Sequence, residues 1–276
     1  MRMFNQVVII GTGLIGGSLG LALKKQRLAG KVIGISRHLR NAKIAKKIGA
    51  IDKVGLSLEA VSGADLVILA TPIDKIIDFA PEIAAKIKKD CIVIDVGSTK
   101  ERIVSRLSAL IPNFLGCHPL AGSEKKGAIN LEADIFKGSV CILTPTVKTK
   151  PVILNKIRFL WEKIGASVVV LSPDRHDQIL AFTSHLPHLV AFSLIGSVPD
   201  KCLKLSSTGL RDTTRISASD IKLWSQIFLS NRSNLLTALL AFEKELVDLK
   251  IALKNKDKKS LERILSLAQK KRKKIE

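Results

Sequence analysis

The fold is decided by one stretch near the N-terminus, Val7-Val8-Ile9-Ile10-Gly11-Thr12-Gly13-Leu14-Ile15-Gly16. A short β-branched run leads directly into a Gly-x-Gly-x-x-Gly turn, and a helical pattern follows. The first glycine permits the tight turn, the second lets the backbone approach a pyrophosphate, and the third allows close packing of helix on strand. This order predicts a dinucleotide site rather than an unliganded glycine-rich turn, with contacts from Gly11, Gly13, Leu14, Ile15 and Gly16.

The end of the next predicted strand carries the signal for the type of dinucleotide. An acidic residue at this place would bind the ribose 2′-hydroxyl of NAD. The sequence instead has Ser36 and Arg37 there, with Arg40 close behind. Because a guanidinium suits a 2′-phosphate and no carboxylate is present, these residues favour NADP over NAD. The alternative is a solvated basic loop that includes His38.

Short apolar runs alternate with helical patterns through the first half of the chain. This alternation predicts an α/β fold, in which a mostly parallel Rossmann-type sheet is wrapped by helices. The predicted strands cover residues 7–10, 31–35, 65–69, 91–94, 114–117, 140–143 and 168–171.

The strand signals stop after Ser172-Pro173, and long helical patterns fill the remainder. We therefore expect a dinucleotide-binding domain over residues 1–172 and an all-helical substrate and dimerisation domain over residues 173–276. The second part carries a long apolar stripe that includes Leu235, Leu239 and Phe242. Stripes of this kind often close a dimer, so a homodimer is expected.

Composition excludes several classes of protein. Hydrophobic residues make up 46% of the chain, which is enough for a buried core and argues against disorder. Because no apolar run reaches the roughly 20 residues of a membrane span and no signal-peptide pattern is present, a cytoplasmic protein without membrane contact is expected. The 4 cysteines form no Cys-x-x-Cys pair, so reduced thiols and no metal site are expected.

The charge balance is strongly basic, with 45 Lys and Arg against 24 Asp and Glu. Such an excess favours anionic ligands and can support contact with nucleic acid. However, much of it lies in helical lysine runs such as residues 270–274, where lysines usually form a solvated face, and no aromatic stacking residues lie among them. We expect a small-molecule substrate and no nucleic-acid partner.

Polar residues follow several of the predicted strands, at the sheet edge where ligands bind in open α/β folds. Thr71 and Pro72 follow one strand and are expected to contact the cofactor, while Ser98 follows the next. His118 lies between Cys117 and Pro119 at the end of another. A neutral imidazole there suits the removal of a hydroxyl proton while a hydride leaves.

Five motifs in this order resemble the prephenate and arogenate dehydrogenases, over nearly the whole chain. They are Gly13-Leu14-Ile15-Gly16-Gly17-Ser18, Asp95-Val96-Gly97-Ser98-Thr99-Lys100, His118-Pro119-Leu120-Ala121-Gly122-Ser123-Glu124, Ser184-His185-Leu186-Pro187-His188 and Leu210-Arg211-Asp212-Thr213-Thr214-Arg215-Ile216.

The resemblance implies an oxidative decarboxylation, in which a cyclohexadienol gives up a hydride and carbon dioxide and becomes aromatic. It implies that His118 accepts the hydroxyl proton, that Ser98 orients it, and that Arg215 binds a substrate carboxylate. Arg211 is a second anion contact or the partner of Asp212 in a surface ion pair.

The resemblance also places His185 and His188 at the substrate cleft, as gating residues or as a structural pair. His176-Asp177 is interpreted as structural, and Trp224 as either a residue near the cleft or part of the core.

Some alternatives stay open on the sequence. The pair Ser36-Arg37 moves the chain toward the NADP-using, arogenate-type branch, but no residue distinguishes prephenate from arogenate. Another two-domain hydroxyacid or imine dehydrogenase is the nearest rival, and a non-catalytic dinucleotide sensor is a rival of another class. His118 together with Arg215 favours a prephenate or arogenate dehydrogenase over both rivals.

Overall fold

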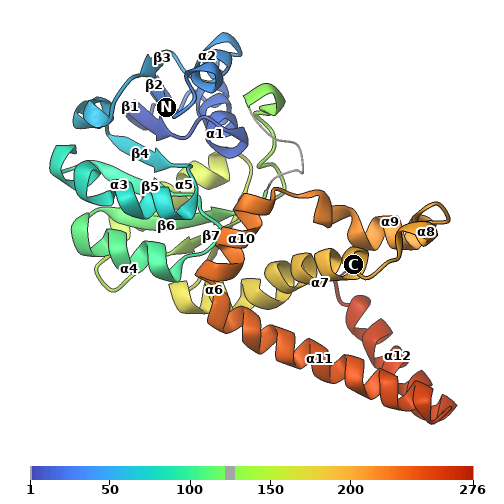
Figure 1. Cartoon of the computed structure of the whole chain (residues 1–276). Helices are drawn as coiled ribbons and strands as arrows, with labels where there is room; N and C mark the ends of the chain where they lie inside the picture. Colours follow the sequence, from blue (N-terminus) through green and yellow to red (C-terminus); the bar gives the residue numbers. More distant parts are fainter. Residues whose placement is uncertain (1, 122–127, 276) are drawn as a thin grey trace.

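The computed structural model describes residues 2–121 and 128–275, and an eight-stranded sheet forms its centre (Figure 1). The strand order is β3-β2-β1-β4-β5-β6-β7-β8, and β7 runs antiparallel to β6 while the other neighbours are parallel. The strands are β1 (Phe4–Ile10), β2 (Ala29–Ile35), β3 (Lys53–Gly55), β4 (Leu66–Leu69), β5 (Ile92–Asp95), β6 (Phe114–Pro119), β7 (Val140–Thr144) and β8 (Ser167–Val170).

Helices cover both faces of the sheet, so the central strands are buried on both sides, as parallel strands usually are. One apolar core joins the sheet to α1 (Leu14–Lys25), α2 (Leu39–Lys47) and α5 (Pro151–Lys163). The other joins it to α3 (Ile73–Lys86), α4 (Glu101–Leu110) and Ile227 of α10 (Ile221–Ser230). The second core therefore also anchors the helical part of the chain to the sheet.

The predicted fold class is confirmed, and the sheet contains every strand that the sequence predicted. The prediction missed β3, which has three residues and no buried side chain. Such a short strand carries too little alternation of polar and apolar residues to be recognised in a sequence. Cys91, Cys117 and Cys141 are buried and Cys202 is exposed, and all are free thiols.

The chain after β8 is helical throughout the described residues, as predicted. It begins with one continuous helix made of α6 (Pro173–Leu180), a π-helical turn (Ala181–His185) and α7 (Leu186–Gly196). Short helices α8 (Asp200–Leu203) and α9 (Thr208–Thr214) lead to α10. Figure 1 shows α11 (Arg232–Lys254) and α12 (Lys258–Arg272) extending away from the sheet as an arm.

One described helix, Pro173–Gly196, is long and apolar enough to cross a membrane by length and composition. A single such helix is weak evidence for a span, because core helices of globular proteins pass the same test. Only 22% of its most apolar window is buried in this single chain. The arm also carries exposed apolar side chains, which follow one stripe of α11: Leu236, Leu240, Val247 and Ile251.

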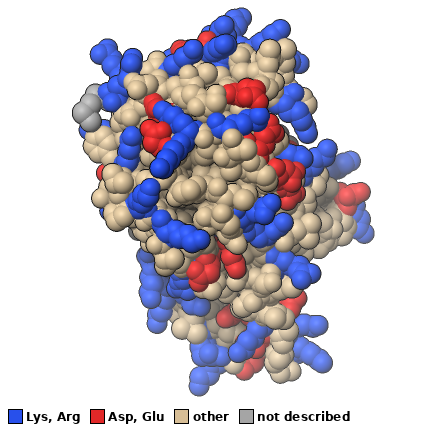
Figure 2. Space-filling view, turned by 90° about the vertical axis from the view of Figure 1, so that its left-hand side faces the viewer, with Lys and Arg blue, Asp and Glu red and all other residues tan. Residues whose placement is uncertain are grey.

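The basic side chains do not form one continuous patch on the face that Figure 2 shows. Lys and Arg are scattered over that face, with Asp and Glu between them (Figure 2). Several are paired with carboxylates, as Lys24 is with Asp52 and Lys88 is with Asp65. On this face the charge fits the predicted solvated surface better than a nucleic-acid groove.

Candidate active site

The glycine-rich turn between β1 and α1 has the geometry that a dinucleotide requires. Gly11 has a φ of +104°, and a Cβ there would lie 2.2 Å from the carbonyl oxygen of Ala70. A Cβ on Gly16 would lie 2.0 Å from the carbonyl oxygen of Gly11, so helix and turn approach too closely for a side chain. A Cβ on Gly13, by contrast, would meet nothing within 4 Å. The backbone at Gly13 thus faces open space at the N-terminus of α1, where a phosphate would bind.

Two hydroxyl groups near this turn are buried without a hydrogen-bond partner among the described residues, Thr12 Oγ1 and Thr71 Oγ1. An unpaired buried hydroxyl is costly unless a ligand or water completes it. Thr71 and Pro72 connect β4 to α3. Thr71 also lies close to the glycine-rich turn, because a Cβ added to Gly11 would be 3.0 Å from Thr71 Cγ2. Because β2 and β4 flank β1, the turn lies at the point where the strand order reverses, which is where dinucleotides bind. The residues present therefore fit a dinucleotide.

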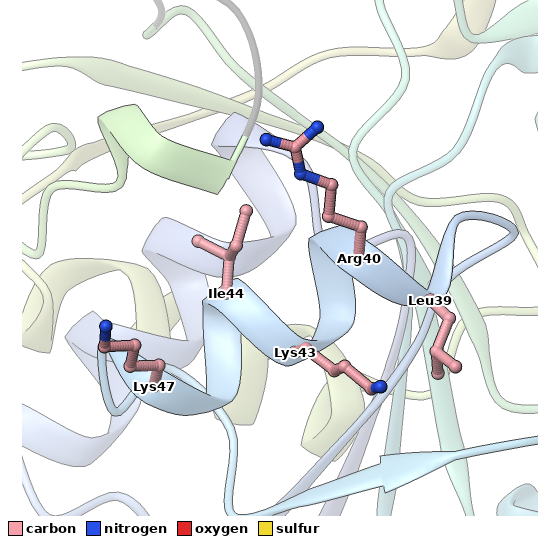
Figure 3. Close-up of a pocket in the computed structure, with 5 residues that line it drawn as sticks. All are labelled: Leu39, Arg40, Lys43, Ile44 and Lys47. Carbon is pink, nitrogen blue, oxygen red and sulfur yellow. The ribbon is translucent and has the colours of Figure 1, made fainter.

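We call Ser36, Arg37, His38 and Arg40 the adenosine end of the site, because they follow β2. Ser36 is half-buried and the other residues are exposed. The guanidinium of Arg37 lies against His38, with Nη2 at 3.0 Å from His38 Nε2. Figure 3 shows Arg40 on α2, where it lines a shallow hollow with Leu39, Lys43, Ile44 and Lys47. In this view the ends of the Arg40 and Lys43 side chains extend in different directions from α2 (Figure 3).

His118 lies at the carboxyl end of β6 and is 9% exposed. Its Nδ1 lies 2.8 Å from Nε2 of His176, and Nδ1 of His176 lies 2.7 Å from Oδ1 of Asp177. His176 and Asp177 belong to α6, so the histidine of the sheet meets its partners on the first helix of the helical part. Among the described residues, no hydrogen bond involves Nε2 of His118.

A fully buried ion pair joins the same group of side chains. Lys100 Nζ lies 2.5 Å from Asp95 Oδ2, and both side chains have an exposed fraction of 0%. Asp95 also accepts hydrogen bonds from the backbone N–H groups of Gly97 and Cys117. The Lys100 side chain passes Gly116, where a Cβ would lie 3.4 Å from Lys100 Cδ and 2.3 Å from Thr144 Oγ1. We call this group the polar junction: Asp95, Lys100, His118, His176 and Asp177.

The electrostatics of the polar junction keep His118 neutral. Burial lowers the pKa of His118 well below its ordinary value, and the neighbouring His176, Lys100 and His185 lower it further. The imidazole is therefore unprotonated and able to accept a proton near neutral pH. Burial likewise raises the pKa values of the Cys117 and Cys141 thiols, so neither offers a thiolate beside this base.

A second group of aromatic and basic side chains lies beside the polar junction. The rings of His188 and Trp224 are stacked, with their centroids 3.4 Å apart, while His185 meets Trp224 edge-on at 6.3 Å. Arg215 is close enough to lower the pKa of His188, although burial is the larger cause. Asn231 links the two groups, because its Nδ2 donates to the carbonyl oxygen of Asp177 and to Nδ1 of His185.

The structure thus brings together most of the predicted substrate and catalytic residues. Ser98 is half-buried in the loop after β5, but among the described residues no hydrogen bond joins it to His118. Arg211 is exposed on α9, and no ion pair of the described residues connects it to Asp212 or to the second group. The residues Gly122-Ser123-Glu124 of the third motif lie outside the described residues.

The sequence analysis interpreted His176 and Asp177 as structural and did not predict their contact with His118. Their link to His118 joins residues 58 positions apart, and a single sequence carries no local signal for such a contact. Adjacent His and Asp directly after a predicted domain boundary were the available hint. The burial of Lys100 was not predicted, because nothing in the neighbouring residues indicates that a lysine there is buried.

Two family models together cover most of the chain. The model described as the prephenate dehydrogenase nucleotide-binding domain matches residues 19–170, and that described as the prephenate dehydrogenase dimerization domain matches residues 172–267. The chain belongs to the prephenate dehydrogenase family. The predicted family is therefore confirmed, and with it the reaction class, an oxidative decarboxylation in tyrosine biosynthesis.

Curated relatives and solved structures agree with this assignment. The cyclohexadienyl dehydrogenase of Zymomonas mobilis is 35% identical over 93% of this chain and 91% of its own length, and the prephenate dehydrogenase of Bacillus subtilis is 31% identical over 97% and 75%. The structure of the Aquifex aeolicus prephenate dehydrogenase with hydroxyphenyl propionate and NAD+ is 33% identical, with a TM-score of 0.93 over 99% of this chain and 98% of that one. A Synechocystis arogenate dehydrogenase is 30% identical, with a TM-score of 0.85 over 98% and 100%.

Proposed function

We propose that this chain oxidises the cyclohexadienol ring shared by prephenate and arogenate, with His118 as the base and NADP as the preferred cofactor. The observation that carries the proposal is the position of His118. It is a neutral, buried imidazole at the carboxyl end of a strand, on the same sheet edge as the glycine-rich turn and beside the group that contains Arg215. A base, a hydride acceptor and an anion contact are the three components that this reaction needs.

His118 takes the proton of the ring hydroxyl on Nε2 as the hydride leaves the same carbon. The nicotinamide ring, when bound, accepts that hydride. The bond to the ring carboxylate then breaks, its electrons complete the aromatic ring, and carbon dioxide leaves. The proton on His118 returns to the oxygen of the product, so that the base is regenerated. Ser98 lies in the neighbouring strand-end loop and is proposed to orient the hydroxyl group.

The substrate contacts are proposed to come from the second group of side chains. The planar fork of Arg215 suits bidentate binding of a carboxylate, and the exposed Arg211 is a further anion contact on the neighbouring helix. His185 and His188 flank Trp224 and give the group a polar edge on an aromatic platform. Their position next to Asn231 and Arg215 supports a role in closing the site around the substrate.

The preference for NADP is supported by the adenosine end. Ser36 stands where NAD-binding chains of this fold carry a carboxylate, and the exposed guanidinium of Arg37 is available to a 2′-phosphate. Contacts to the rest of the dinucleotide are proposed for Gly11, Gly13, Leu14, Ile15, Gly16, Thr71 and Pro72. The Aquifex aeolicus structure contains NAD+, so the two cofactors must be compared directly for this chain.

We also propose a homodimer formed through the helical domain, with the domains divided at residue 172. The division is supported by the end of β8 at Val170 and the start of α6 at Pro173. The dimer is supported by the match to a dimerization domain and by the exposed apolar stripe of α11. Sedimentation of the wild type and of Leu240→Arg tests it, because a charge in this stripe should shift a dimer toward monomer.

The function itself is tested by following nicotinamide reduction with purified protein in each combination of prephenate or arogenate with NAD or NADP. We expect turnover with at least one substrate and a higher kcat/KM for NADP than for NAD. A higher kcat/KM for NAD would contradict the cofactor proposal alone. The absence of turnover in every combination, with dinucleotide binding intact, would contradict the proposed reaction.

A further inference from the structure

The hydrogen bonds of the polar junction have a defined direction, which begins at Asp177. Its Oδ1 accepts from the backbone N–H of Lys100 at 2.7 Å, and its Oδ2 accepts from the backbone N–H of Glu101 at 3.0 Å. These amides lie at the start of α4, whose N-terminus favours a negative charge. Both oxygens of Asp177 are therefore acceptors, and the side chain is held as a carboxylate.

The direction of each following bond is determined by this acceptor. Because Asp177 Oδ1 accepts, Nδ1 of His176 must carry the hydrogen. A neutral His176 then has a lone pair on Nε2, so the bond of 2.8 Å to His118 requires a hydrogen on His118 Nδ1. The lone pair of neutral His118 consequently lies on Nε2, the atom without a partner among the described residues.

We propose that His176 and Asp177 are positioning residues that fix His118 in the tautomer whose Nε2 can accept the substrate proton. The inference deepens the proposed function, on which it rests. It also assigns a role to the domain interface, because His118 comes from the sheet and both positioning residues come from α6. His118 therefore has both positioning residues only when α6 packs against the start of α4.

The same arrangement supports the base after it has reacted. A proton on Nε2 makes His118 an imidazolium, which keeps its Nδ1–H bond to His176. The carboxylate of Asp177 lies on the far side of His176, one ring away from this new positive charge. The charge of Lys100 opposes this imidazolium, and the paired carboxylate of Asp95 offsets part of that charge.

Other contacts, which do not involve His176, hold the helical domain against the sheet. Asn231 donates to the backbone carbonyl oxygen of Asp177, and Thr99 Oγ1 lies 2.9 Å from Ser230 Oγ. Asp177 itself binds the start of α4 through its carboxylate. Replacing the His176 ring therefore removes the link to His118 while these contacts between sheet and helices remain.

The test compares His176→Gln with His176→Leu. In the glutamine variant, the Asp177 carboxylate attracts the amide NH2, which leaves the amide oxygen to accept from His118 Nδ1. Leucine offers no acceptor, so the His118 tautomer is no longer fixed. We expect His176→Leu to lower kcat about 10- to 100-fold with KM unchanged, and His176→Gln to stay within about threefold of wild type. Ser230→Ala, which removes a different bond across the interface, is the control and should retain wild-type kcat.

A spectroscopic measurement separates positioning from structural support. The chain has five histidines, so the ring nitrogen signals of His118 can be assigned in 15N-labelled protein without substrate. The wild type and His176→Gln should show the hydrogen of His118 on Nδ1, and His176→Leu should show a changed tautomer. Equal kcat in the two variants, or a wild-type His118 with its hydrogen on Nε2, would overturn the inference. Because the spectrum is recorded without turnover, it tests the tautomer of His118 independently of the proposed reaction.

Discussion

The polar junction and the adenosine end lie on the same edge of the sheet but differ in how their side chains are held. In the polar junction, the side chains are buried and each has a short hydrogen bond or ion pair to another member. At the adenosine end, Arg37, His38 and Arg40 are exposed, and Arg37 has its hydrogen-bond contact with the adjacent His38. One region is fixed by its own contacts, and the other is available to the ligand.

This difference decides how each region should respond to change. Removing a member of a buried network leaves its partner without a hydrogen bond or with an uncompensated charge, so activity and stability should both be sensitive. An exposed arginine has no buried partner to leave behind. Its replacement should alter the affinity for one ligand and leave the fold unchanged.

The largest effect is expected for His118→Ala. Loss of the base should lower kcat by about 10²- to 10⁴-fold, because general base catalysis typically contributes that much. The dissociation constant of the dinucleotide should stay near the wild-type value, which fluorescence titration measures. A wild-type kcat in this variant would remove His118 from the mechanism.

The next effect concerns stability. Lys100→Met leaves the Asp95 carboxylate buried without its counter-charge, and we expect the free energy of unfolding to fall by about 3–5 kcal/mol in urea denaturation. The double variant Lys100→Met/Asp95→Asn removes both charges and should recover part of the loss. If the double variant is less stable than the single one, the ion pair is not what stabilises this region.

A smaller effect is expected from pH. Burial is the main cause that lowers the pKa of His185 from 6.5 to about 4. The folded chain then binds fewer protons than the unfolded chain below pH 6.5, so this contribution to stability is complete above that pH and is lost as the pH falls toward 4. Between pH 7 and pH 5 the loss should be about 2 kcal/mol from this group.

Urea denaturation at the two pH values measures this loss. The contribution of His185 to this loss should disappear in His185→Gln, whereas His38→Gln at the exposed adenosine end should keep it. The lowered pKa values of His118 and His176 act in the same direction. An unfolding free energy that rises on acidification would contradict the burial of these neutral rings.

The smallest effect is expected at the adenosine end. Arg37→Ser should raise KM for NADP by about 5- to 10-fold, the equivalent of about 1 kcal/mol, and leave KM for NAD and both kcat values unchanged. Lys43→Ser is the control for a general loss of positive charge, because Lys43 is an exposed cation of the neighbouring helix α2 and does not follow β2 directly. Equal effects of the two variants would indicate a general loss of positive charge rather than a specific phosphate contact.

The parts of the structure that local sequence determines were predictable. The spacing of Gly11, Gly13 and Gly16 shows in the sequence itself where the backbone must turn tightly and pack closely. It therefore allowed the first strand and helix to be placed correctly. His118 was recognisable because a strand pattern ends at it. The family resemblance added Arg215 and the two histidines at positions 185 and 188, which no pattern of spacing would have connected to His118.

The remaining parts depend on contacts between distant segments. His176 reaches His118 across the domain interface, and the buried side chain of Lys100 passes Gly116 of β6. The antiparallel pairing of β7 with β6 likewise follows from packing rather than from an alternation of polar and apolar residues. Such features can be recognised only in the three-dimensional structure, because they are stabilised by contacts with residues distant in the sequence and not by sequence neighbours.

The central claim is that His118 removes a proton in a reaction that couples hydride transfer to loss of carbon dioxide. The most direct test measures reduced nicotinamide and released carbon dioxide in the same sample, for the wild type and His118→Ala, with the best substrate and cofactor. The account predicts equal amounts of the two products in the wild type and a parallel fall of both rates in the variant. Nicotinamide reduction without carbon dioxide release would contradict it and would indicate a simple hydroxyacid or imine dehydrogenase.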